Sequence, residues 1–295
     1  MKNKNNKYDS KSKSDYQKLK SHKNDKQQVL GKGKKKEYKK NRTERILTVG
    51  TWVVILSIWY IITKLELFSP TLVPSPYKVW TTFIDILNEG YNHVSLWKHL
   101  GASFQRLFIA LILAIVTAIP MGLLSGYFSK IKAVIDSVVE FYRPLPPLAY
   151  YTLLILWFGI DNTSKVVLLY LAAFAPIYIA CVSAVRKVNE DYILSAKSLG
   201  AGQKKVFFKI VLPACLPEIF IGIRTAVGVS YTTLVSAEMV AATSGIGWMV
   251  LDASNFLKSN VIVVGILIMG FTGILIDFGL RHLEKRIVYW KGQVK

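Results

Sequence analysis

A few ionisable residues interrupt the apolar segments of this chain, and they are the side chains best placed for recognition or chemistry. Arg106, Arg224 and Glu238 stand inside long hydrophobic runs, and Asp277 and Arg281 stand near the end of the last one. A charge in apolar surroundings is costly, so it either pairs with another group or serves a function. The first question is therefore which of these residues pair.

Spacing answers part of that question. Arg224 and Glu238 are 14 residues apart on one predicted helix, which is about 21 Å, so they cannot pair with each other. We expect Arg224 to be an interface anchor, or otherwise to contribute to cavity electrostatics. Glu238 should pair with a neighbouring helix or, as the alternative, line a solute path or gate. Asp277 and Arg281 are one turn apart, which predicts an intrahelical pair. Arg106 is interpreted as an interface anchor, with attraction of an anion as the alternative.

Other chemistry finds little support in the sequence. The four histidines are dispersed, and the two cysteines, Cys181 and Cys215, have no metal or disulfide spacing, so we interpret both as free thiols. The sequence contains no HExxH, no G-x-S-x-G and no paired intramembrane aspartates, which disfavours a membrane enzyme. It also contains no G-x-x-x-x-G-K-[ST], so nucleotide should bind on another polypeptide.

The elements that must position these residues are apolar. The chain is 52% hydrophobic, and its long apolar runs disfavour a soluble globule. Because a segment in lipid must satisfy its backbone internally, the sequence predicts an all-α polytopic membrane protein with about six transmembrane helices. The runs lie near residues 46–64, 104–128, 146–159, 166–185, 219–242 and 261–280.

Two stretches between these runs carry amphipathic patterns. Residues 79–87 follow a proline-rich connection and read as a short external or interfacial helix. The third apolar run is short, and the prolines at 144, 146 and 147 must break or kink a helix there. We expect the chain to enter the membrane near Pro146, after an interfacial segment that carries Lys130, Lys132, Asp136 and Glu140.

The net charge of +20 is unevenly distributed. Residues 1–45 hold 17 of the 38 basic residues and 5 of the 18 acidic ones. This composition predicts a disordered cytoplasmic tail, with a lipid-headgroup or nucleic-acid patch as the weaker alternative; no nucleic-acid partner is expected. Beyond the tail, six crossings would place 14 Lys and Arg on the inner side and 4 on the outer side. Both termini and the 186–217 loop are therefore predicted to be cytoplasmic.

That loop has the most informative pattern. Residues 191–199 have helical spacing and end at Gly200, and a second helix should run over 202–211 and end at Pro213. Phe207, Phe208 and Ile210 would form an apolar ridge for a soluble partner, although a hairpin that packs on its own bundle is the alternative.

The loop resembles the EAA loop of ATP-binding-cassette importer permeases, whose pattern is E-A-A, three residues, Gly, nine residues and I-x-L-P. Here Gly200 is followed by nine residues and then by Ile210-Val211-Leu212-Pro213, so this half matches in full. The Glu-Ala-Ala positions hold Leu194, Ser195 and Ala196, so the family's glutamate is absent. The resemblance implies that the coupling to an ATPase involves nine residues: Ala196, Leu199, Gly200, Ala201, Phe207, Phe208, Ile210, Leu212 and Pro213.

Three further stretches, 143–160, 215–224 and 232–250, resemble the sulfonate, taurine and nitrate permease branch of that superfamily. The resemblance covers roughly residues 70–292 and implies a type I importer fold like that of MetI. We divide the chain into the tail 1–45, a first helix with an external segment over 46–103, and a permease core over 104–292 that contains the coupling loop 189–217. Glu238, Arg224 and Trp157 are candidate pore or gate residues, and the Gly245-Ile246-Gly247 turn should lie outside.

The implied function is ATP-driven, binding-protein-dependent import of a small anion, most of all taurine or an aliphatic sulfonate, across a bacterial cytoplasmic membrane. Nitrate or bicarbonate, or a thiamine-precursor pyrimidine, is the alternative cargo; an ion-gradient carrier or a membrane enzyme is more remote. The implied partners are a second permease copy, a cytoplasmic ATPase dimer, an external solute-binding protein and the lipid bilayer. ATP and Mg²⁺ would bind on the ATPase, and no cofactor or metal is expected on this chain.

Overall fold

The computed structural model describes residues 46–290, and the chain divides into two units at Phe68 that are taken in turn. The described part of the first unit is the helix Ile46–Lys64, which is long and apolar enough to cross a membrane, as predicted. The basic tail expected over residues 1–45 lies outside the described residues.

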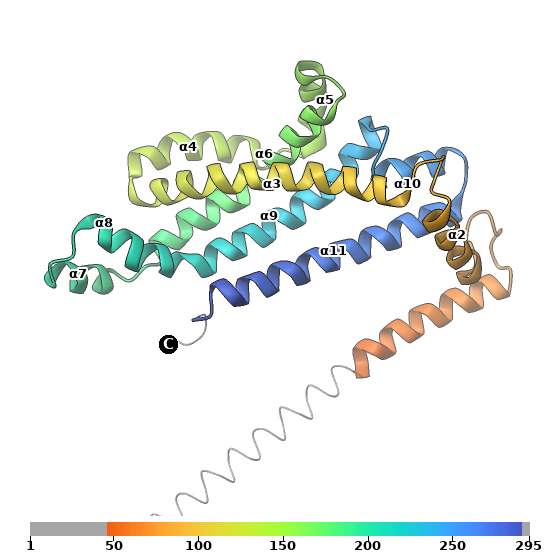
Figure 1. Cartoon of the computed structure of the whole chain (residues 1–295), viewed down its shortest axis with the longest axis horizontal. Helices are drawn as coiled ribbons and strands as arrows, with labels where there is room; N and C mark the ends of the chain where they lie inside the picture. The colour runs from red at the N-terminus through yellow and green to blue at the C-terminus, as the bar shows by residue number, and fades with distance from the viewer. Residues whose placement is uncertain (1–45, 291–295) are drawn as a thin grey trace, which may run out of the picture. The chain divides into compact units, whose positions relative to one another are not determined.

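The second unit is a set of helices, and the residues described contain no β-strand beyond one isolated bridge between Tyr91 and Val94 (Figure 1). The prediction of a nearly all-helical polytopic protein is thus confirmed. In chain order the helices are α2 (Pro76–Asn88), α3 (Leu96–Tyr127), α4 (Ser129–Tyr142), α5 (Pro147–Phe158), α6 (Asn162–Arg186), α7 (Glu190–Ser198), α8 (Gln203–Val206), the π-helix η1 (Phe207–Val211), α9 (Leu212–Ala241), α10 (Ile246–Asn255) and α11 (Ser259–Ile287).

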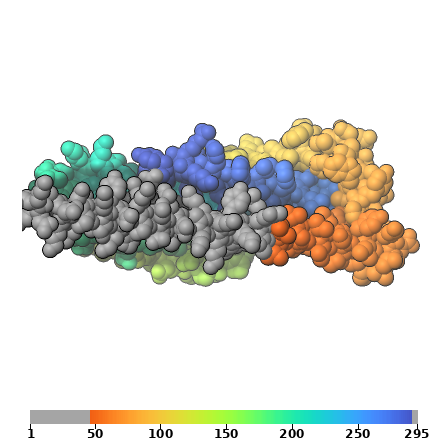
Figure 2. Space-filling model, turned by 90° about the horizontal axis from the view of Figure 1, so that it is seen from below, coloured from red at the N-terminus to blue at the C-terminus, as the bar shows by residue number. Residues whose placement is uncertain are grey.

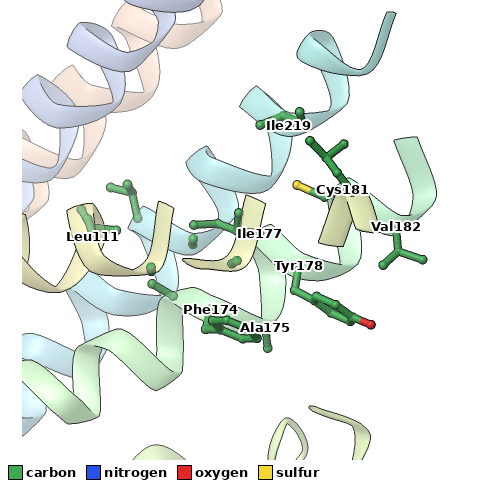
Figure 3. Packing of buried hydrophobic residues seen from close by; sticks show 14 of the residues in the cluster. Leu111, Phe174, Ala175, Ile177, Tyr178, Cys181, Val182 and Ile219 are labelled. Carbon is green, nitrogen blue, oxygen red and sulfur yellow. The ribbon is translucent and has the colours of Figure 1, made fainter. Parts of the chain in front are cut away.

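The core lies where α3, α6 and α9 pack together. Leu111 of α3, Ile177 and Cys181 of α6, and Ile219 of α9 belong to one buried cluster (Figure 3). Several fully buried alanines separate these larger side chains, and such small residues let helix backbones approach each other closely. They are Ala110, Ala114, Ala118, Ala173 and Ala226.

Five of the six predicted crossings are long apolar helices: Ile46–Lys64, Leu96–Tyr127, Asn162–Arg186, Gln203–Ala241 and Ser259–Ile287. The sixth is present only as the 12-residue α5. At 1.5 Å per residue, α5 is about 18 Å long, shorter than the hydrocarbon core of a bilayer. The third apolar run, predicted near residues 146–159, thus corresponds to α5 alone, and α4 ends before it begins.

The segment predicted to be interfacial forms α4, and hydrogen bonds join it to α6. Tyr178 of α6 donates a hydrogen bond to Asp136 at 2.7 Å, and Tyr142 donates to the carbonyl of Leu171 at 3.3 Å. From Asp136 to Tyr142 the chain advances along α4, whereas their partners, Tyr178 and Leu171, run backward along α6. The two helices therefore lie antiparallel. Asp136 is neutralised by its ion pair with Lys132 and accepts a hydrogen bond from Tyr178, so its charge can be tolerated beside the bundle.

The end of the bundle formed by α2 and α10 is joined by polar contacts. The short helix predicted over residues 79–87 is present as α2, and Asn260 of α11 donates to Thr82 of α2 at 2.7 Å. Tyr91 donates to Asp252 of α10 at 2.8 Å. The helix α3 begins at Leu96, earlier than the predicted residue 104, because Ser95 caps it.

Candidate functional site

The predicted coupling loop forms a short helix, a turn and the start of a long helix at the end of the bundle opposite α10 (Figures 1 and 2). The Asn189 side chain caps α7 by accepting a hydrogen bond from the Asp191 N–H at 2.9 Å. Glu190 and Asp191 stand in the first turn and Lys197 in the last, which suits the helix dipole. The sequence therefore favours this helix locally.

Gly200 ends α7, as its spacing predicted. Its φ of +80° lies in the left-handed region. The Gly200 N–H bonds to the Lys197 carbonyl at 2.9 Å, and the Ala201 N–H bonds to the Ala196 carbonyl at 3.0 Å. These two bonds form a Schellman motif, which turns the chain sharply toward α8.

The predicted coupling residues divide between an inner and an outer face. Ala196, Ala201 and Phe207 pack against the main core cluster, and Phe207 also meets the ring of Tyr127 edge-on with ring centres 5.8 Å apart. Ile210, Leu212 and Pro213 are half-buried at the base of the loop. Of the expected ridge, only Phe208 points outward.

Three large apolar side chains of the loop are exposed, among exposed charged residues that include Lys197, Lys204 and Lys205. Leu199 is 88% exposed, Phe208 62%, and Leu194, at the position of the family's glutamate, 57%. Large apolar side chains that are exposed on one loop are candidates for contact with a partner. We call Leu194, Leu199 and Phe208 the loop face.

The chain after the turn is one long helix, which corrects the prediction that Pro213 ends a second helix. The helical path runs without a break from Gln203 to Ala241. A π-turn over Phe207–Val211 precedes Pro213, and the Leu212 N–H bonds to the Phe207 carbonyl five residues back. A π-turn leaves room for a ring that has no N–H to donate, so the helix can continue.

Glu238 lies in the most polar buried part of the molecule. Its carboxylate pairs with the Arg106 guanidinium at 2.7 Å, and the two side chains are only 1% and 5% exposed. Ser103 donates to the same carboxylate at 2.7 Å, and the Gly247 N–H donates at 3.0 Å. Of the two roles predicted for Glu238, the structure thus shows pairing with a neighbouring helix.

Arg106 is buried, which corrects its interpretation as an interface anchor. Besides Glu238, it donates to the Asn162 side chain at 2.7 Å and to the Ser244 carbonyl at 2.8 Å. The guanidinium thus joins α3 to the first residue of α6, to α9 and to the turn before α10. A charge this well bonded can stay in an apolar bundle.

The Gly245-Ile246-Gly247 turn wraps around this carboxylate. A Cβ on Gly245 would come within 2.3 Å of the Glu238 carboxyl carbon, and one on Gly247 within 2.5 Å of the Val235 carbonyl oxygen. The Gly245 N–H donates to His99 at 3.2 Å, and Trp248 stacks on the same imidazole. The expected tight loop is present only as a bend over residues 243–245, because Ile246 and Gly247 begin α10, and the start of this helix holds Glu238.

Two further candidates stand elsewhere. Arg224 reaches from α9 to α11, with its guanidinium 3.1 Å from Asp277 and 3.7 Å from Glu284. The predicted pair of Asp277 and Arg281 is also present, at 2.7 Å. Trp157 lies on α5 and is 68% exposed. Their assignment to a pore or gate remains a prediction.

The pairing of Arg106 with Glu238 was not predicted. Both residues were recognised as charges inside apolar runs, and two opposite charges in different apolar helices are a signal that could have suggested the pair. The role of His99 had no such signal. Within residues 46–290, no cluster of three His, Cys, Asp or Glu residues could hold a metal ion, and Cys181 and Cys215 are buried free thiols.

Known proteins resemble this chain over most of its length. The family described as binding-protein-dependent transport system inner membrane component matches residues 118–289. The taurine transport system permease protein TauC of Escherichia coli (strain K12) is 40% identical over 250 residues, 84% of this chain and 91% of that one. A putative aliphatic sulfonates transport permease protein, SsuC of Bacillus subtilis (strain 168), is 34% identical over 238 residues, 81% and 85% of the two chains.

A solved structure of the MetNI methionine ABC transporter in inward-facing conformations shares the fold. Its TM-score is 0.55 at 16% sequence identity, over 65% of this chain and 95% of that one. The helices described above thus share the arrangement of that solved structure. The chain belongs to the family of inner-membrane components of binding-protein-dependent transport systems, as an ABC importer permease of the sulfonate, taurine and nitrate group.

Proposed function

We propose that this chain is the permease subunit of an ATP-driven importer of taurine or an aliphatic sulfonate. The observation that carries the proposal is the loop face, three exposed apolar side chains on a loop whose first helix is capped at both ends. The 40% identity to a taurine permease supports the choice of cargo. Nitrate, bicarbonate and a thiamine-precursor pyrimidine are the alternative solutes.

The proposed assembly has two copies of this permease, a cytoplasmic ATPase dimer and an external binding protein. ATP and Mg²⁺ would bind on the ATPase, and this chain would catalyse no reaction. Both termini and the loop would face the cytoplasm, in keeping with the 14-to-4 distribution of Lys and Arg.

Coupling would work through the loop face. When ATP closes the ATPase dimer, each ATPase subunit moves the loop docked on it. Because α7 is tied to the core through Ala196 and Ala201, and α8 continues into α9, that motion would reach the bundle. The partner then shifts the population between outward-open and inward-open states, provided that it contacts the two states differently.

The test is reconstitution of the permease in vesicles with its ATPase and binding protein. Uptake is measured with taurine, methanesulfonate, ethanesulfonate, nitrate and the pyrimidine, with and without ATP. We expect ATP-dependent uptake of the sulfonates that requires the binding protein. Uptake driven by an ion gradient without ATP would overturn the mechanism, and uptake of nitrate or the pyrimidine alone would overturn the cargo.

A further inference from the structure

Two cavities lie side by side along α6 and share three lining residues, Arg143, Ile179 and Ser183. The first, of about 500 Å³, lies between the α4–α5 connection, α6 and α9. The second, of about 350 Å³, lies between α4 and the end of α6 near Arg186. Because they share a wall, we treat them as one passage and call it the α4–α6 groove.

Arg143 occupies the middle of this groove. It follows α4 directly, so it lies about 21 Å along that helix from its start. Its neighbour Tyr142 bonds to Leu171, the tenth of the 25 residues of α6. The Arg143 N–H bonds to the Val139 carbonyl at 2.9 Å, which fixes the backbone before the prolines. Arg143 therefore stands at mid-depth of a membrane-spanning helix, rather than in the inner loop where the charge count had placed it.

The charges around Arg143 leave its guanidinium available. Two of the acidic residues that line the groove are already paired, Asp136 with Lys132 and Glu218 with Lys187, the latter at 2.8 Å. Within the described residues, the Arg143 guanidinium makes no hydrogen bond or ion pair, and only its backbone N–H is bonded. Glu140 and Arg186 also line the groove, so its total is four basic and three acidic residues.

An arginine at this depth cannot face lipid. Charged side chains inside membrane proteins face the bundle interior or a water-filled cavity, because exposure to hydrocarbon is too costly. Arg143 is exposed in the single chain. We therefore infer that the groove is an aqueous space and that the proposed second permease copy covers its open side in the assembled transporter.

We propose that Arg143 binds the anionic group of the solute as it passes through the α4–α6 groove. The inference rests on the proposed function and adds a residue that selects for charge. A guanidinium presents paired N–H donors that match the oxygens of a sulfonate or carboxylate. The surrounding walls suit a short alkyl chain, since they are mostly apolar with a few hydroxyls. They include Tyr150, Ala175, Ile179, Ser183, Thr225 and Val229.

The first test compares uptake by single variants in the reconstituted transporter. Arg143→Gln should raise the KM for taurine uptake about tenfold or more, as expected for loss of one charge-assisted hydrogen bond. The KM of Arg143→Lys should lie between those of the wild type and Arg143→Gln, because lysine keeps the charge and loses the paired donors. Lys130→Gln is the matched control: it removes a charge from the exposed start of the same helix and lines neither cavity.

Stimulation of ATP hydrolysis by the loaded binding protein is measured on the same vesicles. We expect Arg143→Gln to keep this stimulation, because the residue lies far from the loop face. A variant with wild-type KM and maximal rate would overturn the role of Arg143 while leaving the proposed function intact. If the wild-type transporter takes up none of the anions, the cargo proposal fails, and the second test decides on Arg143.

The second test needs no transport. A Ser183→Cys variant places a thiol in the wall that both cavities share, and the native cysteines are fully buried. The thiol is treated with a methanethiosulfonate reagent that carries an ethylsulfonate, and with its trimethylammonium counterpart. The rate of the anionic reagent relative to the cationic one should exceed the ratio for a free thiol. Adding Arg143→Gln should lower that ratio severalfold, whereas adding Lys130→Gln should not; an equal ratio in all three proteins would overturn the proposal.

Discussion

The guanidinium of Arg106 and the carboxylate of Glu238 form a buried ion pair 2.7 Å long between α3 and α9. The two residues are 132 positions apart in the chain. Ser103, Asn162, Ser244 and Gly247 supply the remaining hydrogen bonds, so neither charge is left without partners. This arrangement favours a structural function: it holds α3, α6, α9 and α10 together at one end of the bundle.

Removal of one member of this pair should be severe. In Glu238→Gln or Arg106→Met, the remaining charge stays buried without its counter-ion, which costs about 3–5 kcal/mol of unfolding free energy. The double variant should be more stable than the sum of the two single losses predicts, because it leaves no unpaired charge. Chemical unfolding in detergent micelles measures the unfolding free energy of the wild type, the two single variants and the double variant. Arg281→Gln serves as the control, since its pair with Asp277 is exposed, and it should unfold like the wild type. Additive losses would contradict the pairing.

The glycine turn should tolerate no side chain. In Gly247→Ala the new Cβ would lie 2.5 Å from the Val235 carbonyl oxygen and 3.0 Å from the Glu238 Cβ. Such overpacking should cost about 1–3 kcal/mol of stability. Gly228→Ala is the matched control, because Gly228 lies inside α9 with no atom within 4 Å of an added Cβ. There the better helix propensity of alanine should stabilise by up to about 1 kcal/mol. Equal melting temperatures for the two variants would be inconsistent with this account of the turn.

Introduction of a charge into the loop face tests whether this surface binds the ATPase. Leu199→Asp should weaken binding of the cognate ATPase to the detergent-solubilised permease and abolish ATP hydrolysis stimulated by the loaded binding protein. The change should leave folding intact, because Leu199 is 88% exposed. Leu72→Asp makes the same substitution at another exposed leucine, 69% accessible and outside the loop, and should behave like the wild type. Normal ATPase binding by the Leu199 variant would refute the docking surface.

Substitution of Phe207 should affect the stability of the permease, whereas substitution of the neighbouring Phe208 should affect its coupling to ATP hydrolysis. Phe207 packs on the core and on Tyr127, whereas Phe208 is 62% exposed. Phe207→Ala should therefore lower the melting temperature of the permease, and Phe208→Ala should leave the melting temperature unchanged but reduce coupled ATP hydrolysis. If Phe208→Ala lowered the melting temperature and Phe207→Ala reduced only coupled ATP hydrolysis, these assignments of Phe207 and Phe208 would be wrong.

The basic tail should be dispensable for insertion. Deletion of residues 2–40 removes most of the tail's Lys and Arg but none of those beside later helices, which should still set the orientation. Uptake and cysteine labelling from each side of the membrane measure the result. An inverted protein, or loss of uptake by a correctly inserted one, would assign the tail a role that its composition does not reveal.

The sequence predicted those features that depend on neighbours along the chain. Gly200 marked the end of α7 because a left-handed residue is needed there, and the run of apolar residues in each long helix marked a crossing. The prediction that a helix ends at Pro213 was wrong, because it depended on a backbone conformation that the residue types do not reveal. A proline breaks a regular helix, but a π-turn one step earlier accommodates it, and the residue types alone do not announce that turn.

What the sequence by itself determined was the class of molecule, the apolar helices and the coupling motif, because hydrophobicity, helix period and capping are local properties. Only the tertiary structure decided which charges meet. Arg106 and Glu238 come together across 132 residues, and Arg143 is carried to mid-depth because α4 packs along α6. The physical reason is that the cost of a buried charge depends on its neighbours in space, and those neighbours come from helices far apart in the chain.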